Sequence, residues 1–90
     1  MAQTRTTFAE AWKDEFDRMS AEVDWFAMTV AGRARILNKF NEDATRRAAL
    51  RVRRGDVLRY GSADIASIER KFVRRAHRLG VTRHDLRQFE

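Results

Sequence analysis

Cysteine and proline are absent from this 90-residue chain, and glycine occurs only four times. The absence of cysteine excludes disulfides, thiolate metal ligands and thiol catalysis. Proline is the strongest helix breaker, so the glycines are the main local interruptions left: Gly32, Gly55, Gly61 and Gly80. No stretch alternates apolar and polar residues with period two, so we expect no strands. These absences predict an all-α fold, a small bundle of four to five helices.

Long apolar runs are also missing. The longest, from Trp25 to Gly32, is far shorter than the roughly 20 residues that a bilayer-spanning helix needs. The N-terminus lacks the apolar core of a signal peptide, and Glu10, Asp14 and Glu15 follow it directly. We therefore expect a cytoplasmic protein without membrane contact, folded as a single helical domain over residues 1–90.

The most distinctive feature that the chain does have is sorted charge. Residues 1–30 carry three bases and six acids, whereas residues 32–90 carry sixteen bases and seven acids, so the net charge of +6 arises in the C-terminal two-thirds. This asymmetry predicts a nucleic acid or an acidic protein surface as partner. Arginine outnumbers lysine sixteen to three. Either the bidentate phosphate contacts of arginine or a GC-rich genome accounts for that excess.

Residues 1–31 predict an acidic, aromatic pair of helices. Thr7 and Glu10 have the spacing of a capping box, in which each side chain bonds to the backbone amide of the other residue. Phe8, Trp12 and Phe16 then fall on one stripe of the first helix. This stripe is most simply explained as part of the core.

A second helix is expected from Ser20, as its N-cap, to about Ala31. Apolar residues cover nearly its whole circumference, and Trp25 and Met28 lie outside the face that its neighbours can bury. An exposed Trp–Met patch is typical of a protein interface. We therefore predict a partner interface at Trp25 and Met28, used either by a homodimer or by a different protein.

Residues 32–54 predict a helix that ends in an arginine-rich arm. Ile36, Leu37, Phe40 and Ala44 form an apolar stripe, but its continuation falls on arginines. A helix charged on several sides buries little against a core, so we expect the arm to project and to exchange its amides quickly. Such an arm binds phosphates or an acidic protein, or it is a solvated face. Its candidate nucleic-acid-binding residues are Arg46, Arg47, Arg51, Arg53 and Arg54.

Residues 62–90 predict a long helix, a tight corner and a short last helix. Ser62 is the expected N-cap of the long helix, and Gly80 is its expected stop. Thr82 and Asp85 have capping-box spacing at the start of the last helix. The face of the long helix opposite its apolar stripe carries Arg70, Arg74 and Arg78 among its bases.

The corner also carries a motif. Its matching positions are Ala76 where the helices cross, Leu79-Gly80-Val81 in the turn, and Leu86 and Phe89 on the inner face of the last helix. In these positions residues 72–89 resemble the helix-turn-helix of bacterial DNA-binding proteins, and the phrase Leu-Gly-Val-Thr-Arg is similar to the Fis-type ending. An ordinary αα-corner, for which a glycine and a capping threonine suffice, is the alternative.

The helix-turn-helix resemblance implies a recognition helix over about residues 83–90. That helix would read base edges in a groove, and the preceding helix would cross phosphates. The base-reading residues implied by the resemblance are Arg83, Arg87 and Gln88. The phosphate contacts that it implies are Arg70, Arg74 and Arg78.

Catalysis, metals and cofactors find no support in the sequence. His77 and His84 lie on different helices, without a third metal ligand at an informative spacing. No glycine-rich phosphate loop is present, and no serine stands in a nucleophile elbow. We expect no enzyme activity, no metal and no cofactor.

The sequence thus predicts a small basic nucleic-acid-binding protein. DNA is preferred over RNA, and the expected role is that of a regulator that uses its helix-turn-helix-like C-terminus. The alternative is a small helical adaptor or inhibitor, of phage or mobile-element type, that docks on another protein or nucleoprotein complex.

Overall fold

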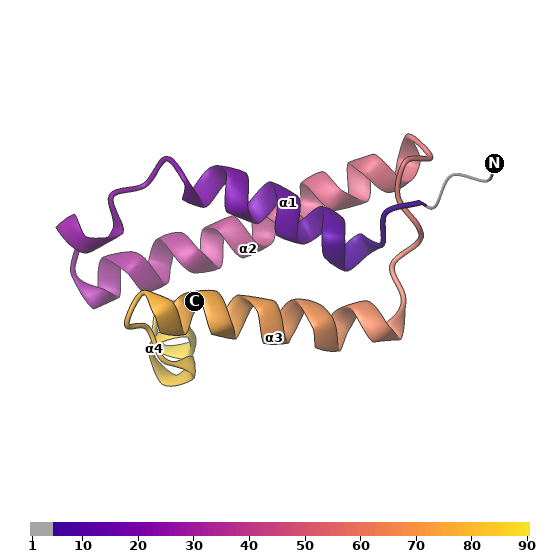
Figure 1. The fold of residues 1–90 in the computed structure, drawn as a ribbon. Helices are drawn as coiled ribbons and strands as arrows, with labels where there is room; N and C mark the ends of the chain where they lie inside the picture. Colours follow the sequence, from indigo (N-terminus) through magenta and orange to yellow (C-terminus); the bar gives the residue numbers. More distant parts are fainter. Residues whose placement is uncertain (1–4) are drawn as a thin grey trace.

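Four α-helices and one 3-10 turn account for most of the chain in the computed structural model, which describes residues 5–90. They are α1 (Phe8–Ser20), η1 (Trp25–Ala27), α2 (Val30–Arg53), α3 (Ser62–Arg78) and α4 (Arg83–Gln88). Figure 1 shows α1, α2 and α3 side by side, each reversing the direction of the one before, with α4 turned away at the end of α3. The all-α prediction is confirmed. The predicted start of the domain, at residue 1, lies outside the described residues.

α1 begins at the capping box that the sequence predicts. The Thr7 hydroxyl accepts a hydrogen bond from the Glu10 amide at 3.2 Å, and the Glu10 carboxylate accepts one from the Thr7 amide at 3.4 Å. These bonds satisfy amides that the start of a helix otherwise leaves unpaired. Phe8, Trp12 and Phe16 are buried, so the aromatic stripe of α1 lies on the core.

The predicted second helix over residues 20–31 is wrong. α1 ends at Ser20, and the chain then forms a loop containing η1 before α2 begins. Two contacts explain the break: the Trp25 indole N–H donates to the Ser20 carbonyl at 3.1 Å, and the Thr29 hydroxyl accepts from the Gly32 amide at 3.1 Å. Thr29 is thus the N-cap of a new helix. The reversal lets α2 return along α1.

The arginine-rich arm does not project, contrary to the prediction. It is the second half of α2, and it packs on α1 through Ala44 and Ala48, which are fully buried. Ala48 belongs to a small second core with Phe8, Ala11 and Val57. Because alanine side chains let two helix backbones approach closely, this half of α2 is held mainly by small residues, with the partly buried Val52 packed on the second core.

The corner between α3 and α4 forms as predicted. Gly80 has a φ of +72°, a conformation that residues with a Cβ rarely adopt. The Thr82 hydroxyl accepts from the Asp85 amide at 3.2 Å, and Asp85 Oδ2 accepts from the Thr82 amide at 3.0 Å. The bonds from Thr82 lower the pKa of Asp85. One detail is wrong: the N-cap of α3 is Gly61 rather than Ser62.

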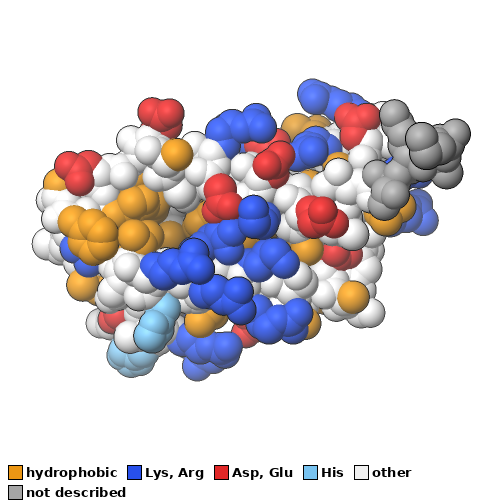
Figure 2. Space-filling view, viewed as in Figure 1, with side chains coloured by type: hydrophobic (Ala, Val, Ile, Leu, Met, Phe, Trp, Pro, Cys, Tyr) orange, Lys and Arg blue, Asp and Glu red, His pale blue; other side chains and the backbone are white. Residues whose placement is uncertain are grey.

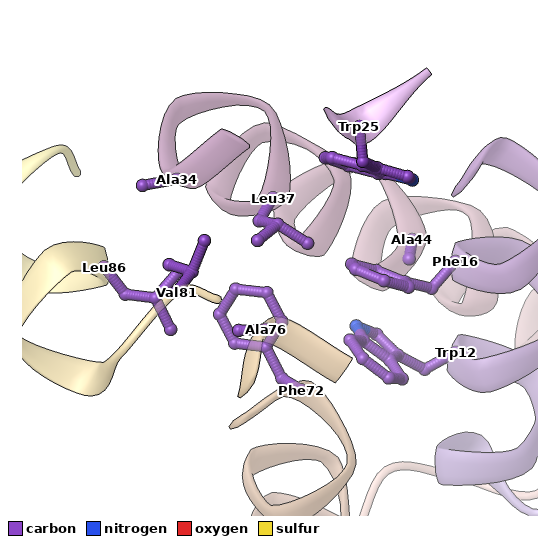
Figure 3. Close-up of a cluster of buried hydrophobic side chains, with 10 residues drawn as sticks. All are labelled: Trp12, Phe16, Trp25, Ala34, Leu37, Ala44, Phe72, Ala76, Val81 and Leu86. Atoms are coloured by element: carbon purple, nitrogen blue, oxygen red, sulfur yellow. The ribbon is translucent and has the colours of Figure 1, made fainter. Parts of the chain in front are cut away.

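The main core joins all four helices and η1 (Figure 3). Trp12 and Phe16 of α1 stack with their ring centroids 4.8 Å apart, and Leu37 of α2 and Phe72 of α3 lie beside them. Val81, in the turn before α4, is buried in the same cluster. The core therefore fixes the corner to the three long helices.

Two polar side chains of α2 tie the remaining segments together. Arg33 Nε donates to the Trp25 carbonyl at 2.7 Å and Arg33 Nη1 donates to the Leu79 carbonyl at 3.0 Å, so this one side chain bridges η1 and the end of α3. The Asn38 amide donates to the Leu86 carbonyl of α4 at 2.8 Å. The molecule is elongated, 47 × 26 × 19 Å, with η1 and the corner at the same end (Figure 1).

Candidate nucleic-acid interface

The outward face of α3 carries a row of arginines. Arg70, Arg74 and Arg78 follow one another at intervals of four residues, about 6 Å along the helix axis, and all three are exposed. The opposite stripe, which contains Phe72 and Ala76, is buried in the core. Among residues 5–90, no carboxylate lies within ion-pair distance of any of the three arginines. Their charge is available to an anion.

The arginine row borders a hollow between α1 and α3, called here the basic hollow. Lys13 of α1 and Ser67, Lys71 and Arg75 of α3 line it together with the row, around a volume of about 290 Å³. Figure 2 shows Lys and Arg side chains gathered over α3 and its border with α1, with acidic side chains above them along α1. An anion in this hollow would meet several positive charges at once.

Arg75 differs from the row because it binds within the molecule. Its guanidinium donates to both carboxylate oxygens of Asp17, from Nε to Oδ1 at 2.7 Å and from Nη2 to Oδ2 at 3.0 Å. The side chain of Arg75 is only 15% exposed. The hydrogen bond from Arg75 outweighs the effect of burial and holds the pKa of Asp17 below its ordinary value. Arg75 therefore joins α3 to α1 across the basic hollow.

The basic hollow stays strongly positive after these internal pairs are counted. Six cations line it: Lys13, Arg70, Lys71, Arg74, Arg75 and Arg78. Within the described part of the chain, Asp17 is the one carboxylate paired with them, through Arg75 and through Lys13 at 3.6 Å. Six positive charges and one negative charge leave +5. This arrangement can bind and orient phosphates through charge-assisted hydrogen bonds.

The corner presents most of the residues that the helix-turn-helix resemblance implied. His84, Arg87 and Gln88 are exposed on α4. Arg83 is exposed as well, but its Nη1 lies 3.4 Å from the Glu69 carboxylate of α3. α4 has six residues and is about 9 Å long, so few side chains reach outward from it. It follows the last arginine of the row along the chain, after the turn at residues 79–82.

The five arginines of the arm are not equivalent. Arg46 forms an ion pair within its own helix. Arg47 and Arg51 lie 3.9 and 3.5 Å from carboxylates of α1, and Arg51 is largely covered. Arg53 and Arg54, at the end of α2, are exposed. None of the five arginines lines the basic hollow, and α1 supplies acids to two of them, Arg47 and Arg51.

Trp25 is not the exposed anchor that the sequence predicted. It is 8% exposed, because its ring packs in the core with its centroid 5.9 Å from that of Phe40. Met28 is half-buried against the same core. The exposed aromatic residue of this loop is Phe26, at 70%, with the Arg33 guanidinium 4.9 Å from its ring centroid. The prediction exposed the wrong ring because it assumed helical spacing where the chain forms a turn.

Sequence reasoning missed Lys13 and Arg75 as members of the basic hollow. Lys13 stands in the acidic N-terminal segment, and only the packing of α1 on α3 brings it to the arginine row. Arg75 follows Arg74 directly, but one step along a helix turns it about 100°, toward Asp17. Its place beside the apolar stripe of α3 was the available signal that it binds inward.

Within residues 5–90, no helix is both long enough and apolar enough to cross a bilayer. In the same range, no three histidine or acidic side chains come together as possible metal ligands. No protein-family model, curated protein or solved structure matches this chain.

Proposed function

We propose that this protein binds nucleic acid through the basic hollow. The proposal rests on one observation: cations from two helices converge on an exposed site that pairs with a single carboxylate among the described residues. A phosphate backbone presents negative charges at regular intervals, and a row of arginines on one helix face can follow them. Each arginine can also bind a phosphate with two parallel hydrogen bonds.

The proposed ligand is DNA in preference to RNA. This preference is based on the corner between α3 and α4. α3 would cross the phosphates while α4 presents Arg87 and Gln88 to base edges, as the helix-turn-helix resemblance implies. The buried Val81 and the capping box at Thr82 support this role, because they hold α4 firmly at the end of the arginine row. With this arrangement the chain would act as a small DNA-binding regulator.

A salt titration with duplex DNA tests the phosphate contacts. If the net charge of +5 neutralises about five phosphates, affinity should fall about 500-fold between about 50 and 200 mM salt. Arg74→Gln removes one contact and should lower the slope of log affinity against log salt by about 1.

Arg18→Gln is the matched control for Arg74→Gln. Arg18 is exposed, pairs with Asp14 on its own helix and does not line the basic hollow, so both variants have the same net charge. The control should bind as the unmodified protein does. Equal losses in the two variants would assign binding to overall charge, and a complex insensitive to salt would remove the proposal.

A second candidate function is docking on an acidic protein surface. It is favoured by Phe26, an exposed aromatic side chain next to Arg33, since aromatic residues and arginine are enriched among interface anchors. In that role the chain would be an adaptor or inhibitor within a protein or nucleoprotein complex. A homodimer through Phe26 would use the same surface.

A further inference from the structure

A second hollow lies beside the basic hollow, and its lining is mainly apolar. Phe16, Trp25 and Leu79 line its volume of about 180 Å³ from α1, η1 and the turn after α3. Arg75 and Arg78 line both hollows, so the apolar hollow opens beside the end of the arginine row. Figure 2 shows apolar side chains at the η1 end of the molecule meeting the Lys and Arg side chains over α3. A cavity of about 150 Å³ can hold benzene, so one aromatic ring fits.

One polar group in the apolar hollow lacks a hydrogen bond. Ser20 lines the hollow, and its Oγ is buried without a partner in the described part of the chain. A buried hydroxyl left unpaired is unfavourable, and most such groups in folded proteins do have a partner. The Oγ atom is itself covered, so a rotation of the Ser20 side chain toward the hollow would let it bond to the polar edge of a ligand.

The walls of the apolar hollow are held in place within the protein. Arg33 donates to the backbone carbonyls of both Trp25 and Leu79, which lie on two sides of the hollow. Arg75 is fixed by its two hydrogen bonds to Asp17. A site whose walls are already ordered loses little conformational freedom when a ligand enters.

We propose that the apolar hollow receives a nucleobase that has left its stack, while the adjoining phosphates bind Arg74 and Arg78. This inference rests on the proposed nucleic-acid binding and names the ligand more closely, as a single strand or a duplex with an unpaired base. The base contacts Trp25 and Leu79, and the Ser20 side chain rotates so that its hydroxyl meets the polar edge of the base. Arg78 lines both hollows and can stack on the ring or bind the phosphate.

The observations favour a base over an apolar side chain from a protein partner. A leucine or phenylalanine side chain would fill the hollow but leave the Ser20 hydroxyl unpaired. It would also bring no negative charge to the arginines at the edge. A nucleotide carries a flat ring, a polar edge and an anion in one unit, and the two adjoining hollows offer an apolar wall and arginines side by side.

Two single strands of equal length and charge test the proposal: an oligothymidylate, and an oligodeoxynucleotide made of abasic units. The abasic strand keeps every phosphate, so phosphate binding alone predicts equal affinities. We expect the abasic strand to bind about tenfold more weakly or worse, because stacking of a base on aromatic side chains contributes on this scale. This comparison uses the unmodified protein.

Indole N–H signals in NMR spectra give a direct readout of the same experiment. The Trp25 signal should shift when the thymidylate strand is added and stay in place with the abasic strand. Trp12 is the internal control, because its indole donates to Asn41 at 2.9 Å and does not line the apolar hollow.

Two variants separate the hollows. Ser20→Leu fills the apolar hollow from α1, so it should lower the affinity for thymidylate to that for the abasic strand and leave the latter unchanged. Arg70 lines only the basic hollow, so Arg70→Gln should weaken both strands by the same factor. Circular dichroism verifies that each variant is folded.

The possible outcomes are distinguishable. Equal affinity for the two strands would overturn base insertion and leave phosphate binding intact. Failure of both strands and of duplex DNA to bind at low salt would overturn the proposed function together with this inference. A Trp25 shift caused by an acidic peptide with an aromatic residue, but not by thymidylate, would overturn the inference and assign the hollow to a protein.

Discussion

At the scale of single residues, orientation on α3 decides what an arginine does. Arg74 and Arg75 are neighbours in the sequence, but Arg75 meets Asp17 across the contact between α1 and α3. Arg74 is exposed, and within residues 5–90 no carboxylate lies within ion-pair distance of it. The two side chains therefore contribute to different properties: Arg75 to the stability of the fold, and Arg74 to the binding of an anion.

Asp17→Asn should destabilise the fold and leave the exposed arginine row in place. The variant keeps the shape of the side chain but gives the Arg75 guanidinium a weaker acceptor. We expect the free energy of unfolding to fall by about 1 kcal/mol, because Asp17 is itself partly solvated. Chemical denaturation at neutral pH measures the change. Asp24→Asn is the control and should have little effect, because Asp24 is exposed and makes no side-chain cap bond.

The pair of Asp17 and Arg75 also sets the sign of a pH dependence. The pKa of Asp17 lies below its ordinary value of 3.8, so the folded protein binds this proton more weakly than the unfolded chain does. The contribution of Asp17 is therefore present well above pH 3.8 and is lost as the pH falls through the lowered folded-state value. The difference in unfolding free energy between the unmodified protein and Asp17→Asn should shrink in acid. If this difference stays constant as the pH falls, the destabilisation by Asp17→Asn does not come from the charge of Asp17.

At the scale of elements, the two halves of α2 pack by different means. The first half uses the large apolar side chains of Leu37 and Phe40. The second half uses Ala44 and Ala48, and its arginines reach the acids of α1. The second half thus depends on close approach to α1, and a single larger side chain at that contact is enough to disrupt it.

Ala48→Glu tests this packing. Glutamate at a fully buried position against Phe8 and Val57 should lower the free energy of unfolding by about 2–4 kcal/mol. Ala49→Glu, the same change at the exposed neighbouring position, should change it by about 0.5 kcal/mol or less. Hydrogen exchange should be slow over the second half of α2 in the unmodified protein. Fast exchange there, with equal effects of the two variants, would mean that the arm projects after all.

Local signals in the sequence located several helix ends correctly. A capping box joins residues three positions apart, so it predicts the start of a helix from the local sequence alone. This holds for Thr7 with Glu10 and for Thr82 with Asp85. Gly80 marks the corner in the same way, because its positive φ is a property of one residue. The spacing of Arg70, Arg74 and Arg78 likewise placed that part of the candidate site on one face.

Contacts between segments that are distant in the sequence could not be predicted from local signals. The helix expected over residues 20–31 is a different case, because the contacts that break it, from Trp25 to Ser20 and from Thr29 to Gly32, are local. The arm was expected to project because the acids that pair with it stand more than thirty positions earlier. Lys13 joins the basic hollow only through the packing of α1 on α3. For the arm and for Lys13, the deciding partner is remote in the sequence.

At the scale of the whole molecule, the sorted charge of the sequence is partly paired within the fold. Asp14 and Glu15 of α1 meet arginines of α2, and Asp17 meets Arg75 of α3. The acidic segment thus neutralises bases at the helix contacts and leaves the outward row on α3 unpaired. Positive charge therefore stays unpaired along the α3 row, whereas much of the positive charge in the second half of α2 is paired.

We expect the isolated chain to sediment as a monomer of 10.6 kDa at micromolar concentration. Trp25 is buried within one chain. The large exposed apolar side chains are distributed over η1, α2, the segment before α3, and α3: Phe26, Val30, Leu50, Leu58, Tyr60 and Ile65. Both tryptophans should then emit as buried indoles, without change on dilution. A dimer that becomes a monomer in Phe26→Ser would favour docking through Phe26, and Leu50→Ser is the matched control.

The elongated shape determines how the molecule rotates in solution. α2 and α3, about 36 and 26 Å long, run along the 47 Å dimension, and α4 turns away from it. N–H bonds lie nearly parallel to a helix axis, so the amides of α2 and α3 reorient only by end-over-end tumbling, whereas those of α4 also sense spinning about the long axis. Nitrogen-15 relaxation rates therefore separate by element, and the rates of α4 report the angle at which the corner is held, with or without DNA.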